Sequence, residues 1–201
     1  KKGAMIGTGG QAATQLEAML AARKLDEVKI YDLNAERCQV FAEQMQKELA
    51  DYGAKIIAAE NSDACIEDAD LIITVTPSAK PVFDGTKVKA GATISCVGTY
   101  EPHKHEMDPA ILPRASKIIC DSKEAALSET GDLLIPIKDG IISEKDILGS
   151  LGDVINGTIK GRENDDEIIV YETVGVAAQD LVAAKVIYDK ALEAGKGMNW
   201  G

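Results

Sequence analysis

Residues 3–12 read Gly3-Ala-Met-Ile-Gly7-Thr-Gly9-Gly-Gln-Ala12, a short apolar run that breaks into glycines. The pattern is G-x-G-x-x-A, with Gly7, Gly9 and Ala12 in the three fixed places. Gly7 permits a tight strand-to-helix turn, Gly9 lets the backbone approach a pyrophosphate, and Ala12 lets helix and strand pack closely. The free N–H groups and the dipole of the helix that follows favour phosphate. The stretch therefore predicts a strand, a phosphate-binding turn and a helix.

An acid stands at the end of the second apolar run, residues 28–32. It lies about 20 residues beyond the fingerprint, where a carboxylate accepts hydrogen bonds from ribose hydroxyls and repels a 2′-phosphate. Asp32 is therefore predicted to bind the adenosine ribose and to favour NAD(H) over NADP(H). The alternative is that Asp32 is the first residue of a turn, or a helix cap, before Asn34. Arg37 is close enough in the sequence to weaken the preference if its side chain folds back.

Composition narrows the class of protein. The chain has 201 residues, 45% of them hydrophobic, which suits one large domain or one domain with extensions. The net charge of −11 and the few aromatic residues exclude a nucleic-acid partner. Neutralisation of phosphates needs a basic patch and stacking of bases needs aromatic side chains, and this chain lacks both. No apolar run approaches the roughly 18 residues of a membrane span, so no membrane partner is expected. Four scattered cysteines indicate free thiols in a reducing cytosol, which predicts a cytoplasmic protein.

Strand-like and helical patterns alternate along the chain. Beyond the fingerprint, strands are predicted at 28–32, 55–59, 70–76, 92–97, 117–120 and 167–171, and helices at about 34–50, 62–69 (capped by Ser62), 131–138, 143–151 and 176–194. The β-branched run at 70–76 is typical of a parallel strand buried on both faces. The fold class is therefore α/β, a doubly wound, mostly parallel sheet of the Rossmann type that binds ligands at the carboxyl ends of its strands.

Several motifs occur in an order that resembles the ornithine cyclodeaminase/mu-crystallin family. They are Ile-Gly-Thr-Gly-Gly-Gln-Ala at 6–12, Ala-Asp-Leu-Ile-Ile-Thr-Val-Thr-Pro-Ser at 69–78, Pro-Val-Phe-Asp-Gly at 81–85, Val-Gly-Thr-Tyr-Glu-Pro at 97–102 with Glu106, Ser-Glu-Thr-Gly-Asp at 128–132, Gly-Ser-Leu-Gly-Asp at 149–153 and Val-Gly-Val-Ala-Ala-Gln-Asp at 174–180. The resemblance covers nearly the whole chain. It implies an NAD(P)-dependent oxidoreductase that acts on the C–N bond of an amino acid or cyclic imino acid.

The resemblance also implies how the chain is organised. Residues 1–175 are expected to form the dinucleotide-binding domain and residues 176–201 a C-terminal helix whose small residues permit packing against a sheet or a partner subunit. Family members are typically homodimers, with a substrate and dimerisation domain that precedes this segment. The chain begins almost inside its first strand, so it is expected to be a piece of a longer protein and to be inactive alone.

The predicted cofactor is NAD, bound at the carboxyl ends of the strands. The cofactor-binding set comprises Gly7, Thr8, Gly9, Gly10, Gln11, Ala12, Asp32, Thr76, Pro77, Ser78, Val97, Gly98 and Thr173. The glycine-rich residues are assigned to the pyrophosphate, and the last six to the path toward the nicotinamide. The hydroxyls of Thr76 and Ser78 are suited to ribose or phosphate oxygens, with turn capping as the alternative.

Tyr100 and Lys104 are the catalytic candidates, and both follow from alignment with the family. Cyclodeaminases carry an Asp two residues before the Pro that corresponds to Pro102, and here Tyr100 takes that place. A phenol with a pKa near 10 is a poor base, which argues against ornithine cyclodeamination. Lys104 matches a Lys of some members, with a solvated loop lysine as the alternative. A second departure is Glu172, where many members have Lys.

Two readings of the function remain open at this stage. The first is an amino-acid dehydrogenase or imine reductase, and the alternative is a non-catalytic NAD(P)H- or small-ligand-binding protein of the mu-crystallin type. A 2-hydroxy-acid dehydrogenase is disfavoured, because neither histidine forms an evident pair with a carboxylate at a strand end. His103 and His105 lack a third ligand, so a surface loop is expected rather than a metal site.

Overall fold

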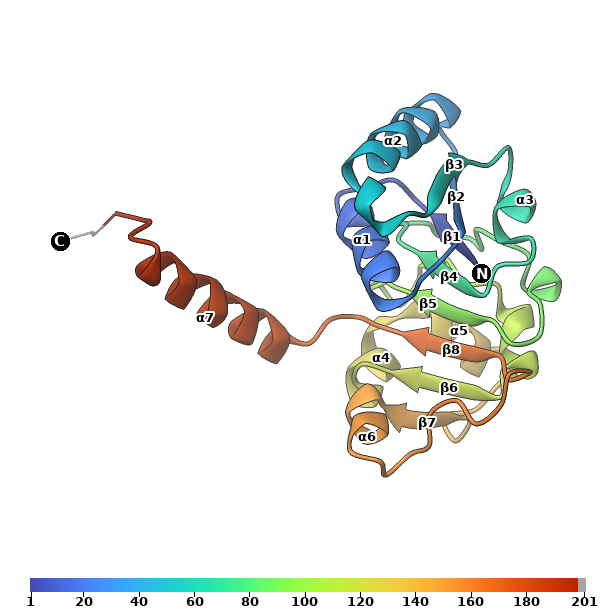
Figure 1. The fold of residues 1–201 in the computed structure, drawn as a ribbon. Helices are drawn as coiled ribbons and strands as arrows, with labels where there is room; N and C mark the ends of the chain where they lie inside the picture. The colour runs from blue at the N-terminus through green and yellow to red at the C-terminus, as the bar shows by residue number, and fades with distance from the viewer. Residues whose placement is uncertain (199–201) are drawn as a thin grey trace.

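Eight parallel strands form one sheet within residues 1–198, the part of the chain that the computed structural model describes (Figure 1). The strands are β1 (Lys2–Ile6), β2 (Glu27–Tyr31), β3 (Lys55–Ala58), β4 (Leu71–Thr74), β5 (Thr93–Cys96), β6 (Lys117–Cys120), β7 (Ile147–Ser150) and β8 (Ile169–Glu172). Their order is β3-β2-β1-β4-β5-β8-β6-β7, and every pair is parallel. The predicted α/β, doubly wound fold is confirmed.

Helices connect the strands. They are α1 (Ala12–Ala22), α2 (Ala35–Glu48), α3 (Ser62–Ile66), α4 (Lys123–Glu129), α5 (Gly131–Lys138), α6 (Leu151–Ile155) and α7 (Ala177–Glu193), with the 3₁₀ turns η1 (Ala50–Tyr52), η2 (Gly85–Lys87) and η3 (Pro109–Arg114). Asn34 begins α2 by accepting a hydrogen bond from the N–H of Arg37 at 2.9 Å. Such caps satisfy a donor that the first turn of a helix leaves free.

Alternate residues of β1 enter two different cores, one on each face of the sheet. Met5 packs with Leu16 of α1 and with buried residues of α2. Ala4 and Ile6 pack on the opposite face with residues of α3, α4 and α5, including Leu133. Because successive side chains of a strand point to opposite faces, a sheet covered on both sides needs a continuous apolar run. The runs seen in the sequence meet that need.

The direction in which successive strands are added to the sheet reverses at β1, which lies between β2 and β4. From β1 the chain proceeds outward to β2 and β3, and then returns to the other side of β1 to form β4. In open α/β sheets, ligands bind outside the carboxyl ends of the strands at such a switch point. The fingerprint turn follows β1 and therefore lies at this switch point.

Three details of the predicted elements are wrong. Residues 143–150 form no helix, and α6 begins only at Leu151. The strand β7 occupies 147–150, because Ile147 and Gly149 pair with Ile118 and Ile119 of β6. Periodicity cannot separate such a short strand from a helical turn. The cap of α3 is Asn61, which accepts a hydrogen bond from the N–H of Ala64, and not Ser62. The helix α4 was not predicted.

The C-terminal helix α7 leaves the carboxyl edge of the sheet and extends away from it (Figure 1). None of its residues is buried, and Leu181 and Ile187 are among the exposed apolar side chains. Of the two packing surfaces expected for α7, this sheet is not contacted by the helix, and packing against a partner subunit stays a prediction. Residues 199–201 of the predicted C-terminal segment lie outside the described residues. None of the helices among residues 1–198 combines the length and apolar character of a membrane-spanning helix.

Candidate functional site

Gly7 makes the turn between β1 and α1. Its φ of +108° belongs to a region that L side chains rarely adopt, and an added Cβ would lie 2.8 Å from the carbonyl oxygen of Val75. Its N–H donates a hydrogen bond to the carbonyl of Tyr31 at 2.8 Å. Any other residue would force the strand ends apart, so Gly7 has the structural role that the fingerprint assigns to it.

The start of α1 offers free backbone donors. Gly9, Gly10 and Gln11 are exposed, and a Cβ added at either glycine would meet no atom within 4 Å. Gln11 occupies the N-cap position, but its side chain makes no capping hydrogen bond. The N–H of Ala12 donates to the carbonyl of Gly9 at 3.0 Å. The other N–H groups at the start of a helix have no intrahelical acceptor, so they remain available to an anion. The residues present therefore fit a pyrophosphate, which would approach over the glycines.

Asp32 lies just beyond β2 and is nearly buried. Its Oδ2 accepts hydrogen bonds from the N–H of Thr8 at 3.0 Å and from the Thr8 hydroxyl at 2.7 Å, and its Oδ1 accepts from the N–H of Asn34 at 2.9 Å. Burial raises the pKa of Asp32, but hydrogen bonds from Asn34, Arg37 and Thr8 outweigh it and lower the pKa below its usual value. The carboxylate is therefore ionised and joined to the fingerprint turn.

Arg37 folds back onto Asp32, as its nearby place in the sequence allows. Its Nη2 lies 2.6 Å from Asp32 Oδ1 and 2.7 Å from Asp32 Oδ2, and its Nε donates to the Thr8 hydroxyl at 3.0 Å. The guanidinium is more than half exposed. A cation at this position offsets the charge that would repel a 2′-phosphate, so Asp32 alone does not decide between the two nucleotides.

Glu106 joins the two loops that follow β4 and β5. Its Oε2 accepts hydrogen bonds from the N–H of Thr76 at 2.7 Å and from the Thr76 hydroxyl at 2.8 Å. Its Oε1 accepts from the N–H of Gly98 at 2.7 Å and from that of Val97 at 3.2 Å. The loops touch so closely that a Cβ on Gly98 would lie 2.2 Å from the carbonyl oxygen of Thr76. The fully buried Glu106 therefore positions this side of the site.

Other predicted residues use their hydroxyls locally. The hydroxyl of Ser78 donates to the carbonyl of Lys80 at 2.7 Å, which corresponds to the turn-capping alternative. Thr173 donates to Oδ2 of Asp121 at 2.6 Å. The same oxygen accepts from the N–H groups of Val174 at 3.0 Å and Gly175 at 2.7 Å. Pro77 is exposed beside Ser78. Asp121 thus anchors the exit from β8.

The catalytic candidates lie on the loop after β5. Tyr100 is 64% exposed and therefore projects into solvent. Lys104 Nζ lies 2.5 Å from Glu101 Oε1, and this hydrogen bond raises the pKa of Lys104. Lys104 is therefore a paired ammonium group at neutral pH. His103 is exposed, and no cluster of three potential metal-binding side chains within residues 1–198 includes a histidine.

Sequence reasoning left three buried carboxyl groups without a role. Glu106, Asp132 and Glu172 lie beneath the loops at the carboxyl edge of the sheet. Glu106 and Asp132 were noticed only within resembling motifs, and Glu172 only as a departure from the family. Local periodicity gives no signal for them, because their environment comes from distant strands.

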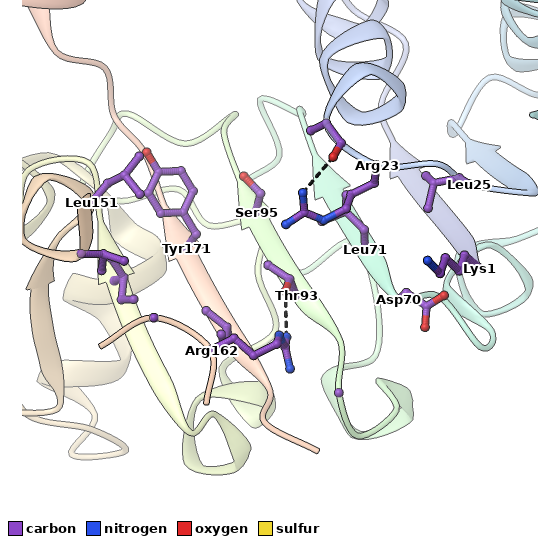
Figure 2. Close-up of a pocket in the computed structure, with 16 residues that line it drawn as sticks. Lys1, Arg23, Leu25, Asp70, Leu71, Thr93, Ser95, Leu151, Arg162 and Tyr171 are labelled. Carbon is purple, nitrogen blue, oxygen red and sulfur yellow. Dashed lines mark hydrogen bonds between the residues drawn. The ribbon is translucent and has the colours of Figure 1, made fainter. Parts of the chain in front are cut away.

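A separate hollow of about 800 Å³ lies on the face of the sheet rather than at the fingerprint (Figure 2). Its floor includes Leu71, Ser95 and Tyr171 from adjacent strands, and Arg23 and Leu151 lie at its rim. The helix α1 covers this face over β1, but no helix among residues 1–198 covers it over β5 and β8. The hollow is mostly apolar in its lining, so it does not compete with the fingerprint as a phosphate site.

Comparisons with known proteins agree with the resemblance. The model of the ornithine cyclodeaminase/mu-crystallin family matches residues 2–195. A Delta(1)-pyrroline-2-carboxylate reductase of Bacillus cereus (strain ZK / E33L) is 38% identical over 193 residues, or 96% of this chain. The chain therefore belongs to the ornithine cyclodeaminase/mu-crystallin family.

Two solved structures share the fold over the whole chain. The Delta(1)-pyrroline-2-carboxylate reductase of Thermococcus litoralis, in complex with NADH and L-proline, has a TM-score of 0.94 and 37% identity. An archaeal alanine dehydrogenase dimer with bound NAD has a TM-score of 0.88 and 33% identity. Each of the two matches covers 100% of this chain. The chain spans 58% of the curated relative and 61% and 60% of these two solved chains.

Proposed function

We propose that this family member binds NAD(H) at the carboxyl ends of β1, β2, β4 and β5, and that the protein to which it belongs is an oxidoreductase of an amino acid or cyclic imino acid. When bound, the nicotinamide supplies or accepts the hydride at the carbon that bears nitrogen. The observation that carries the proposal is the ionised Asp32, held by Thr8 beside an uncapped helix start. The nucleotides named with the two solved relatives support it.

The protein's part in this proposal is to bind and position. The N–H groups at the start of α1 bind the pyrophosphate, and Asp32 accepts hydrogen bonds from the ribose. Glu106 sets the spacing between the Thr76 and Gly98 loops, and this spacing orients the nicotinamide end. Lys104, a permanent cation, is assigned to the substrate carboxylate and Tyr100 to a hydrogen bond, in place of proton removal.

The proposal includes the organisation of the longer protein. Residues 1–175 form the dinucleotide-binding domain, and α7 belongs with a part of the protein outside this segment. The uncovered apolar side chains of α7 support a homodimer, and one solved relative is described as a dimer. A cytoplasmic location is supported by the four cysteines, which are all buried and free.

The alternative function is a non-catalytic binder of NAD(P)H or a small ligand. It is favoured by two features of the loop after β5: Tyr100 stands where cyclodeaminases have an acid, and Lys104 is already paired with Glu101. Turnover separates the two functions. The longer protein is incubated with NADH and cyclic imino acids or keto acids plus ammonia, and oxidation of NADH by any of them excludes the non-catalytic function.

Calorimetric titration with NADH tests the cofactor proposal. We expect micromolar binding that weakens roughly 10- to 100-fold in Asp32→Ala, because hydrogen bonds to a charged group contribute about 1.5–3 kcal/mol. Asp51→Ala serves as the control, since Asp51 is an exposed acid outside the site. Absence of NADH binding, or equal weakening in both variants, overturns the proposal.

A further inference from the structure

Two acidic side chains meet in the interior of the molecule without a counter-ion. Asp132 of α5 and Glu172 of β8 are 1% and 0% exposed. No salt bridge within residues 1–198 reaches either carboxyl group. Burial of an ionised carboxylate is costly unless it is paired or fully hydrogen-bonded. The two groups, called the acid pair below, therefore need another means of compensation.

Each member of the acid pair has one satisfied oxygen and one free oxygen. Asp132 Oδ1 accepts hydrogen bonds from the N–H of Glu106 at 2.8 Å and of Met107 at 2.7 Å. Glu172 Oε1 accepts one from the Thr130 hydroxyl at 2.9 Å. Asp132 Oδ2 and Glu172 Oε2 are buried and have no partner. The Thr99 hydroxyl, which is also buried without a partner, acts on Asp132 and lowers its pKa. Glu172 Oε2 is still left without a donor, and a retained proton supplies one.

The two carboxyl groups are close enough for the charge of one to oppose the ionisation of the other. An oxygen of Asp132, an oxygen of Glu172 and the sulfur of Cys96 all lie within 4.8 Å of one another. Like charges at this distance in an apolar interior do not both ionise, and one proton turns an acceptor into the missing donor.

We propose that Asp132 and Glu172 share one proton at neutral pH, and that the acid pair is thereby able to position Glu106 and the loops it joins. The first half stands on the geometry of the pair alone. The second half rests on the proposed function, because the loops of Thr76 and Gly98 matter to the NAD(H) site. The link is direct: Asp132 Oδ1 holds the N–H of Glu106, and Glu106 holds both loops.

Among the titratable groups around the acid pair, the carboxylates favour retention of the proton, and the buried thiols stay neutral. Cys96 faces the pair from β5, Cys120 from β6, Glu106 from the loop before η3, and Asp121 from the end of β6. Burial raises the pKa of Asp132 to about 7, with the charge of Glu106 adding to it. Burial and then the charge of Asp132 raise the pKa of Glu172 well above its usual value. No basic side chain among these groups opposes the effect.

The shared proton makes stability depend on pH with a defined sign. The unfolded chain loses this proton near pH 4, whereas the folded chain keeps it to higher pH. The folded state therefore holds more protons over that window, so its stability is full below the unfolded pKa and falls as the pH rises toward the folded pKa of the pair. One extra proton changes the unfolding equilibrium constant about tenfold per pH unit.

Glu172→Gln tests the proposal, because an amide nitrogen donates permanently where the shared proton donates in the wild type. Urea unfolding is measured from pH 5 to pH 8 for the wild type and the variant. We expect similar stability at pH 5, and a variant that becomes progressively more stable than the wild type as the pH rises, by up to about tenfold in equilibrium constant per unit. Parallel pH profiles of the two proteins overturn the proposal.

Asp132→Asn places the donor on the other partner and is expected to remove the same pH dependence, since Asn Oδ1 can still accept from Glu106 and Met107. Glu129→Gln, an exposed acid of α4, is the control and is expected to follow the wild type. Metal analysis of the purified protein completes the test. A metal bound at one equivalent, and absent from Glu172→Gln, overturns the shared proton in favour of a cation held with Cys96.

NADH titration from pH 6 to pH 8 tests the second half. If the pair positions Glu106, NADH affinity falls with rising pH in the wild type and is flatter in Glu172→Gln. An equal pH profile in the two proteins overturns the link to the site. Absence of NADH binding at every pH contradicts the proposed function, while the unfolding data, which need no nucleotide, still decide the shared proton.

Discussion

Two groups of acids lie at the carboxyl edge of the same sheet, and their surroundings give them opposite charge states. Asp32, beyond β2, receives hydrogen bonds from two backbone N–H groups, one hydroxyl and a guanidinium, and its pKa is lowered. In the acid pair, Asp132 receives hydrogen bonds from two N–H groups and Glu172 receives one from a hydroxyl, and the pKa values of both are raised. The residue types are equivalent, so the depth of burial, the neighbouring charges and the donors together decide the difference.

The comparison shows how one sheet edge serves two purposes. Asp32 keeps its charge because donors and a cation compensate it, which suits a group that binds ribose hydroxyls. The acid pair sits deeper, under the loops, where a single proton compensates two groups. Glu106 lies between these cases: it is fully buried like the pair, but four hydrogen bonds reach it, compared with five at Asp32.

The largest effect is expected for Glu106→Ala. The substitution leaves the N–H groups of Thr76 and Gly98 without their acceptor in a buried place and opens a cavity. Removal of one partner from such a network costs about 3–5 kcal/mol of unfolding free energy. Urea denaturation at pH 7 measures the change. Glu106→Gln, which keeps one acceptor oxygen, is expected to lose less than half of that amount, and equal losses would show that cavity formation dominates.

An intermediate effect is expected for Asp32→Asn, with a pH dependence opposite to that of the acid pair. The folded pKa of Asp32 is lowered, so its contribution is present above the unfolded pKa near 4 and is lost as the pH falls through the folded pKa. We expect the variant to be about 1–2 kcal/mol less stable at pH 7. The difference should vanish near pH 2, and urea or thermal unfolding at several pH values measures it. A deficit that persists in acid would contradict the role of the charge.

The smallest effect on stability is expected for Arg37→Ala. The guanidinium is largely exposed, and exposed ion pairs contribute about 0–1 kcal/mol. Selectivity should change more than stability, because removal of the cation restores the repulsion between Asp32 and a 2′-phosphate. We expect NADPH affinity to fall several-fold while NADH affinity changes little, as measured by calorimetry. Arg23→Ala, at the rim of the separate hollow, is the control. A selectivity that stays unchanged would assign the choice of nucleotide to Asp32 alone.

Much of the fold and of the adenosine side of the site followed from local sequence patterns. The turn at Gly7, the strands near residues 28–32 and 117–120, and the helix at 131–138 agree with the structure. Glycine spacing and apolar runs encode these features within short windows, because steric limits and burial act on neighbouring residues. The proximity of Arg37 to Asp32 was likewise visible from one helical turn of sequence.

Tertiary structure alone decided the strand order and the buried acids. The last strand, β8, inserts between β5 and β6, and no local pattern states which strands will pair. This insertion brings Glu172 beside Asp132, and the loop after β5 brings Glu106 beneath Thr76. The charge state of a carboxyl group depends on the donors and charges around it, and here those come from residues far apart in the chain. The sequence determined which acids are present; only the folded chain determined which of them keep a proton.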